Sequence, residues 1–230
     1  MMGEPWLTPE AAEAFPEADR RALYDAVALR RDVRHFRAGL DVDAATLDRI
    51  LGAAHRAPSV GHSQPWRFIL VRDLARRQRI RASFLRCREV ESERFAPARR
   101  EAYLSLKLEG IVDAPLNVCV VVDLRERGEA VLGTSVQPDT LRGSAYCAVE
   151  NLWLAARVEG IGVGWVSIVE PAVLRSELAL PAGVEPVAYL CVGHPVAFRR
   201  TPMLEEAGWS SRLSLGEVVR EESWTEAAAR

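Results

Sequence analysis

The sequence predicts one domain that mixes α-helices with β-strands, in the α/β or α+β class. Three observations predict it. The chain has 230 residues of which 49% are hydrophobic, which is enough for one sizeable core, and we treat residues 1–230 as a single domain. Apolar residues recur at the helical period in several long segments. Between these segments lie about four shorter apolar runs with the length and composition of strands.

The helices are recognised by their ends. Asp43 has the position of an N-cap, and Pro58 ends the helix that follows it. Gly160 ends a second, long helix, and in an earlier one Leu23 and Val27 share an apolar face. A first helix is expected to begin near Thr8, in an N-terminal arm of residues 1–16. Further helices are expected over residues 17–30, 43–57, 72–100 and 139–159.

The strands are expected from runs rich in β-branched and aromatic residues, over residues 66–71, 116–122, 162–168 and 187–193. The run 116–122 is almost entirely apolar, which is typical of a strand buried on both faces. From residue 195 to residue 230 the sequence has little periodicity. It is expected to form an arm that lies on its own domain or on a partner subunit.

Charge and cysteine spacing exclude several classes of function. A net charge of −2 provides no basic field for nucleic acid. The chain has no apolar run of the ~18 residues that a membrane helix needs, and its N-terminus lacks the basic and apolar regions of a signal peptide, so we expect a cytoplasmic protein. The four cysteines stand far apart, which predicts neither a metal site nor a structural disulfide.

Two glycine-containing motifs are near misses to known sites. Residues 160–164 (GIGVG) precede a strand, whereas the glycines of a dinucleotide-binding loop follow one. Residues 61–65 (GHSQP) have proline where the serine-hydrolase elbow has its last glycine. Neither motif predicts its usual function here.

Three arginines surround one carboxylate at the end of the helix over residues 17–30: Arg30, Arg31 and Arg34 around Asp32. One interpretation is that the cations compensate the helix dipole. The other is a phosphate clamp, in which Arg30 and Arg34 bind one anion and Arg31 points elsewhere. A carboxylate beside a phosphate costs electrostatic energy, so Asp32 indicates a role other than anchoring.

Two further segments also have two interpretations each. The polar loop over residues 58–65 is either a plain helix-to-strand turn or a set of hydrogen-bonding groups suited to a flat polar heterocycle. Residues 72–100 contain ten arginines and four acidic residues. They form either a solvated helical face or a mobile lid over an anionic site.

In order and spacing, residues 30–36 (RRDVRHF) and 57–68 (APSVGHSQPWRF) resemble the two N-terminal FMN motifs of the nitroreductase superfamily. Within it, the chain is most similar to the flavin destructases that make 5,6-dimethylbenzimidazole. Further matching segments are residues 108–111 (LEGI), 114–116 (APL), 164–167 (GWVS) and 202–209 (PMLEEAGW). The resemblance extends from about residue 20 to residue 224, and its most specific mark is Asp32, where ordinary nitroreductases usually carry a small hydroxyl residue.

The resemblance implies an α+β, nitroreductase-like fold, with a central mixed or antiparallel sheet flanked by helices, in an intertwined homodimer. FMN would lie at the subunit interface, residues 72–110 would form a helical lid, and the arm of residues 195–230 would reach over the partner. It also implies that reduced FMN is the substrate, which O2 fragments to 5,6-dimethylbenzimidazole and erythrose 4-phosphate. A separate NAD(P)H-dependent flavin reductase would supply the reduced FMN.

The same resemblance assigns the site. Asp32 and Ser167 fall on the catalytic positions, Asp32 as general acid and base and Ser167 as a hydrogen-bonding group for oxygen or a reacting hydroxyl. The residues expected to contact FMN are Arg30, Arg31, Asp32, Val33, Arg34, Ser59, Leu108, Ser167 and Arg212. His62 departs from the pattern, since many superfamily members have asparagine there. Two alternatives remain: an FMN-dependent NAD(P)H reductase of nitroaromatics or quinones, and a flavin-binding protein without catalysis.

Overall fold

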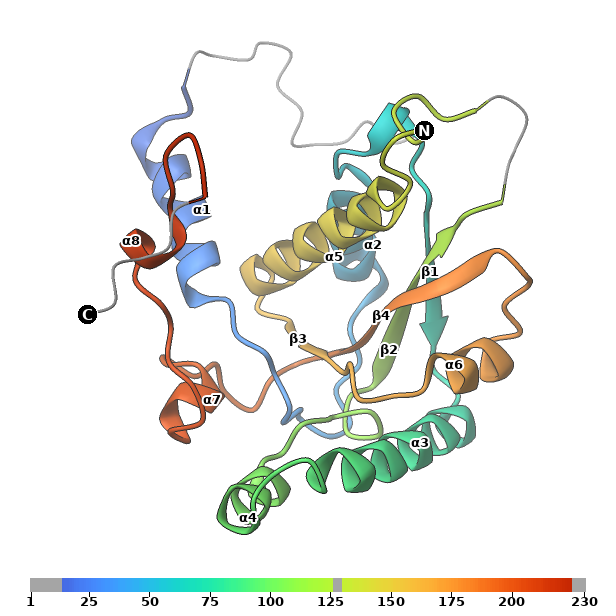
Figure 1. The fold of residues 1–230 in the computed structure, drawn as a ribbon, viewed down its shortest axis with the longest axis vertical. Helices are drawn as coiled ribbons and strands as arrows, with labels where there is room; N and C mark the ends of the chain where they lie inside the picture. Colours follow the sequence, from blue (N-terminus) through green and yellow to red (C-terminus); the bar gives the residue numbers. More distant parts are fainter. Residues whose placement is uncertain (1–13, 126–129, 225–230) are drawn as a thin grey trace.

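A computed structural model describes residues 14–125 and 130–224, and a four-stranded antiparallel sheet lies at its centre (Figure 1). The order in the sheet is β1-β2-β4-β3. The strands are β1 (Trp66–Val71), β2 (Leu116–Asp123), β3 (Gly162–Trp165) and β4 (Val184–Gly193). The prediction of four strands in an α+β fold is confirmed.

Two strand boundaries were predicted wrongly. The strand expected over residues 162–168 ends at Trp165, because after one more backbone bond, from Val166 N to Tyr189 O, the chain turns toward the helix that begins at Pro171. The strand expected from residue 187 begins at Val184, since it continues to pair with β2 beyond an irregularity between Val120 and Val121.

The described helices are α1 (Glu17–Leu29), α2 (Ala44–His55), α3 (Leu74–Ser92), α4 (Pro97–Ser105), α5 (Thr140–Val158), α6 (Pro171–Glu177), α7 (Met203–Glu206) and α8 (Leu215–Val218), with a 3-10 turn, η1 (Val60–His62). Asp43 caps α2 as predicted, because its side chain accepts a hydrogen bond from Thr46 N at 2.9 Å. The helix expected over residues 72–100 is two helices, since Pro97 begins α4. The helix expected near Thr8 lies outside the described residues.

The helices form a layer on each face of the sheet. Helices α2 and α5 cover one face, and α3 and α6 lie on the other (Figure 1). Strand β2 is buried along its whole length, and its alternating side chains divide between two apolar clusters. Val118 and Val120 pack toward α2 and α5, whereas Cys119 and Val121 pack toward α3.

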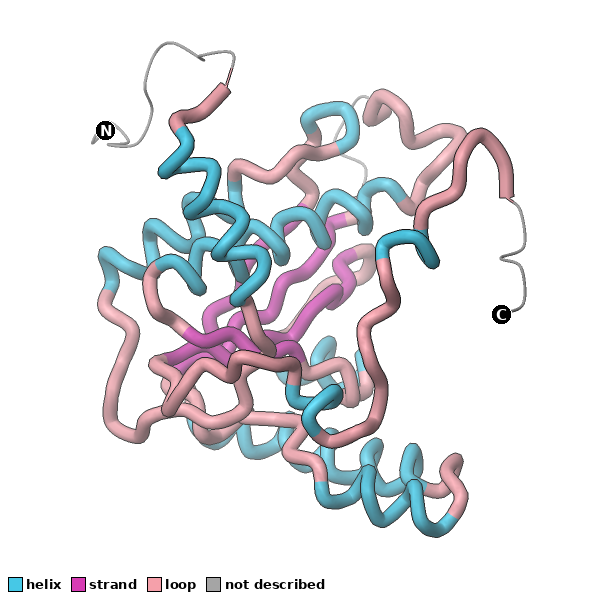
Figure 2. The backbone as a smooth tube through the Cα atoms, turned by 90° about the vertical axis from the view of Figure 1, so that its left-hand side faces the viewer, coloured by secondary structure: helices cyan, strands magenta, loops and turns pink. Residues whose placement is uncertain are grey.

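Helix α1 and the arm after β4 lie outside these layers (Figures 1 and 2). In α1 only Ala26 is buried, and the apolar face predicted from Leu23 and Val27 is 56% and 50% exposed at those residues. The arm continues through α7 and α8 away from the sheet (Figure 2). None of the described helices has both the length and the apolar character needed to cross a membrane.

The segment that follows α1 packs closely against the edge strand β3. Val33 N donates to Val163 O at 2.9 Å, and Asp32 forms a parallel bridge with Val163. A Cβ atom on Gly164 would lie 2.0 Å from Val33 O, and one on Gly162 would lie 2.9 Å from Val33 Cγ1. The glycines of residues 160–164 therefore allow two backbones to approach each other.

Candidate active site

A cavity of about 210 Å³ lies where α1 ends, between the segment after α1 and the arm. Five of the lining residues are arginines, and one is an aspartate. We call it the arginine cavity. It is lined by Arg30, Arg31, Asp32, Arg34, Leu108, Arg199, Pro202, Met203, Leu204 and Arg212. Six residues that the sequence predicted as site residues thus line the same cavity: Arg30, Arg31, Asp32, Arg34, Leu108 and Arg212.

The carboxylate of Asp32 is held by two partners. Its Oδ1 atom accepts a hydrogen bond from Trp165 N at 2.9 Å, and its Oδ2 atom accepts one from Arg34 Nη2. The parallel bridge between Asp32 and Val163 brings the carboxylate to the end of β3, where Trp165 presents its N–H. Orientation of Asp32 is therefore set by the backbone of a strand, which is a rigid support.

Burial raises the pKa of the Asp32 carboxyl group above its ordinary value. Arg34, the Trp165 N–H and Arg30 all lower that pKa, but burial has the larger effect. The side chain keeps 44% of its surface accessible, and since it lines the arginine cavity, that surface faces the space where a ligand would bind. A ligand that excludes water from this surface would raise the pKa of Asp32 further.

Arg34 has unsatisfied hydrogen-bond donors at the same place. The residue is only 8% exposed, and its Nη2 atom also donates to Trp165 O at 2.7 Å. Its Nε and Nη1 atoms are buried and have no hydrogen-bond partner among the described residues. Buried guanidinium donors without acceptors are costly, so an anionic ligand beside them would be stabilising.

Arg30 and Arg31 differ in which of the two interpretations of the arginine cluster they fit, compensation of the helix end or binding of an anion. Arg31 Nη1 donates to Ala28 O at 2.7 Å and Arg30 O at 2.6 Å, so it satisfies carbonyl groups at the end of α1, and its Nη2 atom binds Arg200 O in the arm. Arg30 lies 4.7 Å above the ring of Trp153, with its Nε atom 3.6 Å from Glu150 Oε1. Arg31 thus compensates the helix end, and Arg30 remains in the cavity wall.

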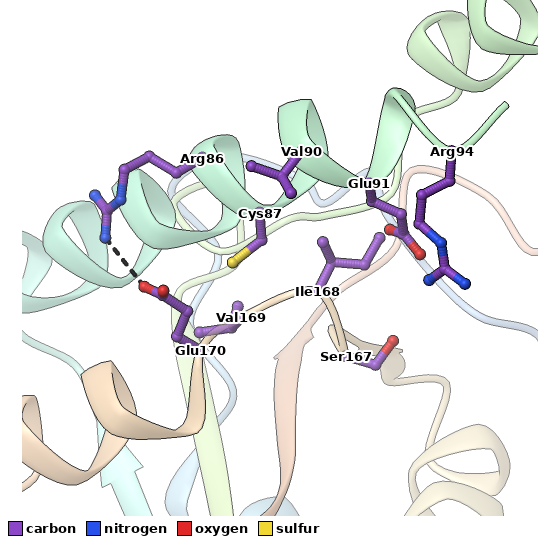
Figure 3. A pocket seen from close by; sticks show the side chains of 9 residues that line it. All are labelled: Arg86, Cys87, Val90, Glu91, Arg94, Ser167, Ile168, Val169 and Glu170. Carbon is purple, nitrogen blue, oxygen red and sulfur yellow. Dashed lines mark hydrogen bonds and ion pairs between the residues drawn. The ribbon is translucent and has the colours of Figure 1, made fainter.

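Ser167 lines a second cavity, of about 590 Å³, between α3 and the loop that leads from β3 to α6 (Figure 3). We call it the Ser167 cavity. Its walls are Arg86, Cys87, Val90, Glu91 and Arg94 on one side and Ser167, Ile168, Val169 and Glu170 on the other. Ser167 follows Trp165 by two residues, which is at most about 7 Å of extended chain. The two predicted catalytic residues therefore lie near opposite ends of one short segment, each beside its own cavity.

Known proteins similar to this chain identify its family. A model described as the Nitroreductase family matches residues 27–194, which include the segment after α1 and all four strands. The chain belongs to the nitroreductase family. The 5,6-dimethylbenzimidazole synthase of Rhodospirillum rubrum is 46% identical over 183 residues, which cover 80% of this chain and 86% of the relative. The 5,6-dimethylbenzimidazole synthase of Rhodobacter capsulatus is 39% identical over 199 residues, or 86% and 96% of the two chains.

Solved structures show the same nitroreductase fold. The crystal structure of oxidized iodotyrosine deiodinase bound to FMN and 3-iodo-L-tyrosine aligns with a TM-score of 0.69 and 22% sequence identity. The alignment covers 88% of this chain and 100% of the other. At this level of identity the likeness establishes the fold alone.

Two predicted residues, Ser59 and Val33, line neither of these two cavities. Ser59 accepts a hydrogen bond from Gln64 N at 3.1 Å, and Val60 N beside it donates to Ser144 Oγ near the start of α5. The arginine cluster instead contacts α5 at Trp153, nine residues farther on, which is about 14 Å along the helix axis. Val33 is 5% exposed, and its side chain belongs to the apolar cluster on the α3 face of the sheet and lies beside Gly162.

One arginine of the cavity, Arg199, is not predicted from the sequence. Arg199 enters from the arm and pairs with Glu206. No periodicity marks this position, and only the neighbouring match at residues 202–209 indicated that the arm approaches the site. The hydrogen bond from the Trp165 N–H to Asp32 is not predicted from the sequence either, because it depends on the bridge between Asp32 and Val163.

Proposed function

We propose that this chain is a 5,6-dimethylbenzimidazole synthase, which uses O2 to fragment reduced FMN to 5,6-dimethylbenzimidazole and erythrose 4-phosphate. The observation that carries the proposal is Asp32. Its carboxyl group is oriented by Trp165 N and Arg34 and has a raised pKa, and Trp165 precedes Ser167 by only two residues in the sequence. The names of the two relatives, at 46% and 39% identity, support the same activity.

The arginine cavity has the chemistry of a phosphate site. Five guanidinium groups surround it, and the buried Nε and Nη1 atoms of Arg34 have no acceptor among the described residues. Its volume of about 210 Å³ is below the ~300–1,000 Å³ typical of pockets that enclose a whole drug-sized ligand. The cavity therefore suits the phosphate and the adjoining ribityl chain, held by Arg30, Arg34, Arg199 and Arg212, while the ring system needs space outside it.

FMN supplies the electrons for the reaction when it is bound in its reduced form. The residues of this chain bind, orient and transfer protons. Asp32 accepts and returns a proton at its carboxylate, and a pKa raised toward the working pH is the property that such a group needs. Ser167 donates a hydrogen bond from its Oγ atom to oxygen or to a reacting hydroxyl. The helices over residues 72–110 form the lid that keeps bulk water out.

We also propose that the site is shared between two subunits of a homodimer. Ser59 is about 14 Å along α5 from the arginine cluster, and no residue of its loop lines the arginine cavity. Among the described residues of a single chain, Leu23 and Val27 of α1 are at least half exposed, and so are several apolar residues of the arm. In the dimer, Ser59 contacts the FMN held by the arginines of the other copy, and the arm of residues 195–230 lies over the partner. The reduced FMN itself comes from a separate reductase.

The test is a product assay. Purified protein receives excess reduced FMN, air is admitted, and 5,6-dimethylbenzimidazole is measured by chromatography. Wild-type protein is expected to form it, while Asp32→Asn and Ser167→Gly lose most of the rate, by roughly 10²–10⁴-fold for the general acid and base. Asp139→Asn, which changes an exposed aspartate at the start of α5, is the matched control and retains activity.

The same assay separates the alternatives. No product from wild-type protein would overturn the proposal. Rapid oxidation of NADH with a nitroaromatic acceptor would identify a conventional reductase of the nitroreductase family. Tight binding of FMN with neither activity would identify a flavin-binding protein without catalysis.

A further inference from the structure

The arm connects the two cavities through one aromatic side chain, Trp209. Pro202, Met203 and Leu204 are in the wall of the arginine cavity, and the chain then continues through α7 to Trp209. The Trp209 N–H donates to Leu204 O at 2.8 Å, so the backbone of Trp209 is tied to the cavity wall itself. A displacement of this wall is therefore passed to Trp209.

The ring of Trp209 lies against α4 and the turn that precedes it. Its centroid is 5.2 Å from that of Phe95, with the rings edge to face at 86°, and 6.1 Å from that of Tyr103. The guanidinium carbon of Arg99 is 4.0 Å from the Trp209 ring centroid, and Arg99 Nη2 donates to Trp209 O at 3.3 Å. These ring contacts are directional, so together they set the position of Trp209 relative to α4.

Tyr103 continues the connection to the Ser167 cavity. Its phenol O–H donates to Glu91 Oε2 at 2.7 Å, and the residue is only 4% exposed. Burial, assisted by the bond to Glu91, raises the pKa of Tyr103 above its ordinary value, so the phenol remains a donor. Glu91 comes from α3 on one wall of the Ser167 cavity, and Ser167 comes from the loop on the opposite wall (Figure 3).

We propose that Trp209 is a positioning residue, which couples occupation of the arginine cavity to the position of α4 and Glu91 at the Ser167 cavity. The proposal rests on the proposed function, because the occupant is the phosphate of FMN. Arg199 and Arg212 flank Trp209 in the sequence and both line the arginine cavity. A phosphate bound to them holds the intervening arm in place, Trp209 with it, and Trp209 then holds Tyr103 and Glu91.

A consequence for specificity follows. Riboflavin has the ring system of FMN and no phosphate, so it leaves Arg199 and Arg212 without an anion. The wall of the Ser167 cavity is then set only when the phosphorylated flavin is bound. Phosphate recognition would contribute to the rate of the chemical step as well as to affinity, since binding energy from a remote group can be used to orient the reacting part.

Hydrogen exchange of the full chain tests the coupling without turnover. In wild-type protein, oxidised FMN is expected to slow amide exchange in residues 91–105, and riboflavin is expected to have no such effect. Trp209→Ala should remove the response to FMN. Glu205→Ala, which changes an exposed residue of α7, is the matched control and should keep it. Equal responses in wild-type protein and Trp209→Ala, or no response to FMN in wild-type protein, would overturn the proposal.

Kinetics with reduced FMN and O2 separate positioning from a purely structural role. Trp209→Ala is expected to bind FMN within about threefold of wild type while forming product about tenfold more slowly, with more O2 consumed per product. Trp209→Phe, which keeps an aromatic ring, should restore most of the rate. Tyr103→Phe keeps the ring contact but loses the bond to Glu91, so it should reproduce the slow kinetics and retain the exchange response.

Other results would refute the coupling or the proposed function. If Trp209→Ala loses FMN affinity and rate in parallel and Trp209→Phe restores neither, Trp209 only anchors the arm and the coupling is refuted. If wild-type protein makes no 5,6-dimethylbenzimidazole, the proposed function fails, and the exchange experiment still decides the coupling.

Discussion

Asp32 links the activity of a single residue to the stability of the fold. A carboxyl group whose pKa is raised by folding stays protonated in the folded chain after the unfolded chain has ionised. As pH rises through the interval between the ordinary value of 3.8 and the raised value, the wild-type free energy of unfolding therefore falls. Above the raised value the loss is constant.

Asp32→Asn should consequently be more stable than wild type at neutral pH, although we expect it to be inactive. Asparagine keeps an oxygen for the Trp165 N–H and has no charge to bury. The difference in free energy of unfolding should grow as pH rises from 3.8 to the raised pKa of Asp32 and stay constant above it, which urea unfolding of both proteins at several pH values would measure. A variant less stable than wild type at pH 7 would show that the Arg34 contact outweighs burial.

Arg212 gives a clean test of phosphate recognition. Among the described residues it has no hydrogen-bond or ion-pair partner, so its removal should leave the fold intact. A hydrogen bond to a charged group contributes about 1.5–3 kcal/mol, so Arg212→Ala should weaken FMN binding by roughly 10- to 100-fold. Riboflavin binding should not change. Equal losses for FMN and riboflavin, measured by flavin fluorescence, would place the phosphate elsewhere.

At this scale the sequence predicted that the arginines around Asp32 meet, but not which role each of them has. Arg30, Arg31 and Arg34 were one cluster with two interpretations, and the structure assigns helix capping to Arg31 and the cavity wall to all three. The division depends on the carbonyl of Arg200 and on the ring of Trp153, which are more than a hundred residues away in the sequence. Local spacing contains no such information.

At the scale of elements, the contact between the segment after α1 and strand β3 holds the site together. A Cβ atom on Gly164 would lie 2.0 Å from Val33 O and 2.6 Å from Arg34 Nη1. Gly164→Ala should therefore lower the free energy of unfolding by about 1–3 kcal/mol or more and weaken FMN binding, because the strand must move away from Asp32 and Arg34.

Gly143→Ala is the matched control for this prediction. Gly143 lies within α5, and nothing stands within 4 Å of its added Cβ atom. Alanine in a helix interior is more stable than glycine by roughly 0.5–1 kcal/mol, so this variant should be slightly stabilised and should bind FMN as wild type does. Unfolding curves that coincide for Gly164→Ala and wild type would show that the strand adapts without cost.

Elements with a strong periodic signal were predicted well, and those decided by tertiary contacts were not. Asp43 and Gly160 mark helix ends locally, so α2 and α5 were placed within two residues. The arginine excess over residues 72–100 was interpreted as a solvated face or an anionic lid. Neither interpretation predicted the ion pairs that several of these arginines form within the chain, as Arg79 pairs with Glu177, Arg81 with Glu109 and Arg86 with Glu170.

At the scale of the whole molecule, residues 14–125 and 130–224 of a single chain leave apolar surface exposed. Leu23 and Val27 on α1, and Leu213, Leu215, Val218 and Val219 in the arm, are each at least half exposed. These residues belong to the two parts that lie outside the sheet-and-helix layers (Figure 2). Exposed apolar surface of this kind is typical of subunit interfaces, and a symmetric dimer could cover it with a second copy.

A shared site predicts that two inactive variants can restore each other. Asp32→Asn damages the residue beside the arginine cavity, and Ser59→Trp fills the loop that we expect to contact FMN in the other copy. In a mixed dimer, one site combines both damaged residues and the other combines intact Asp32 with intact Ser59. Random mixing makes half of the dimers mixed, so about a quarter of the wild-type activity should return.

The experiment uses co-expressed chains with two different tags, and product formation is compared with that of each variant alone. If each site lay within one chain, every site in the mixture would contain a damaged residue and no activity would return. If Ser59→Trp alone were fully active, Ser59 would not contact FMN in either copy. Recovery of a quarter of the activity requires both that the protein is a dimer and that Asp32 and Ser59 of one working site come from different subunits.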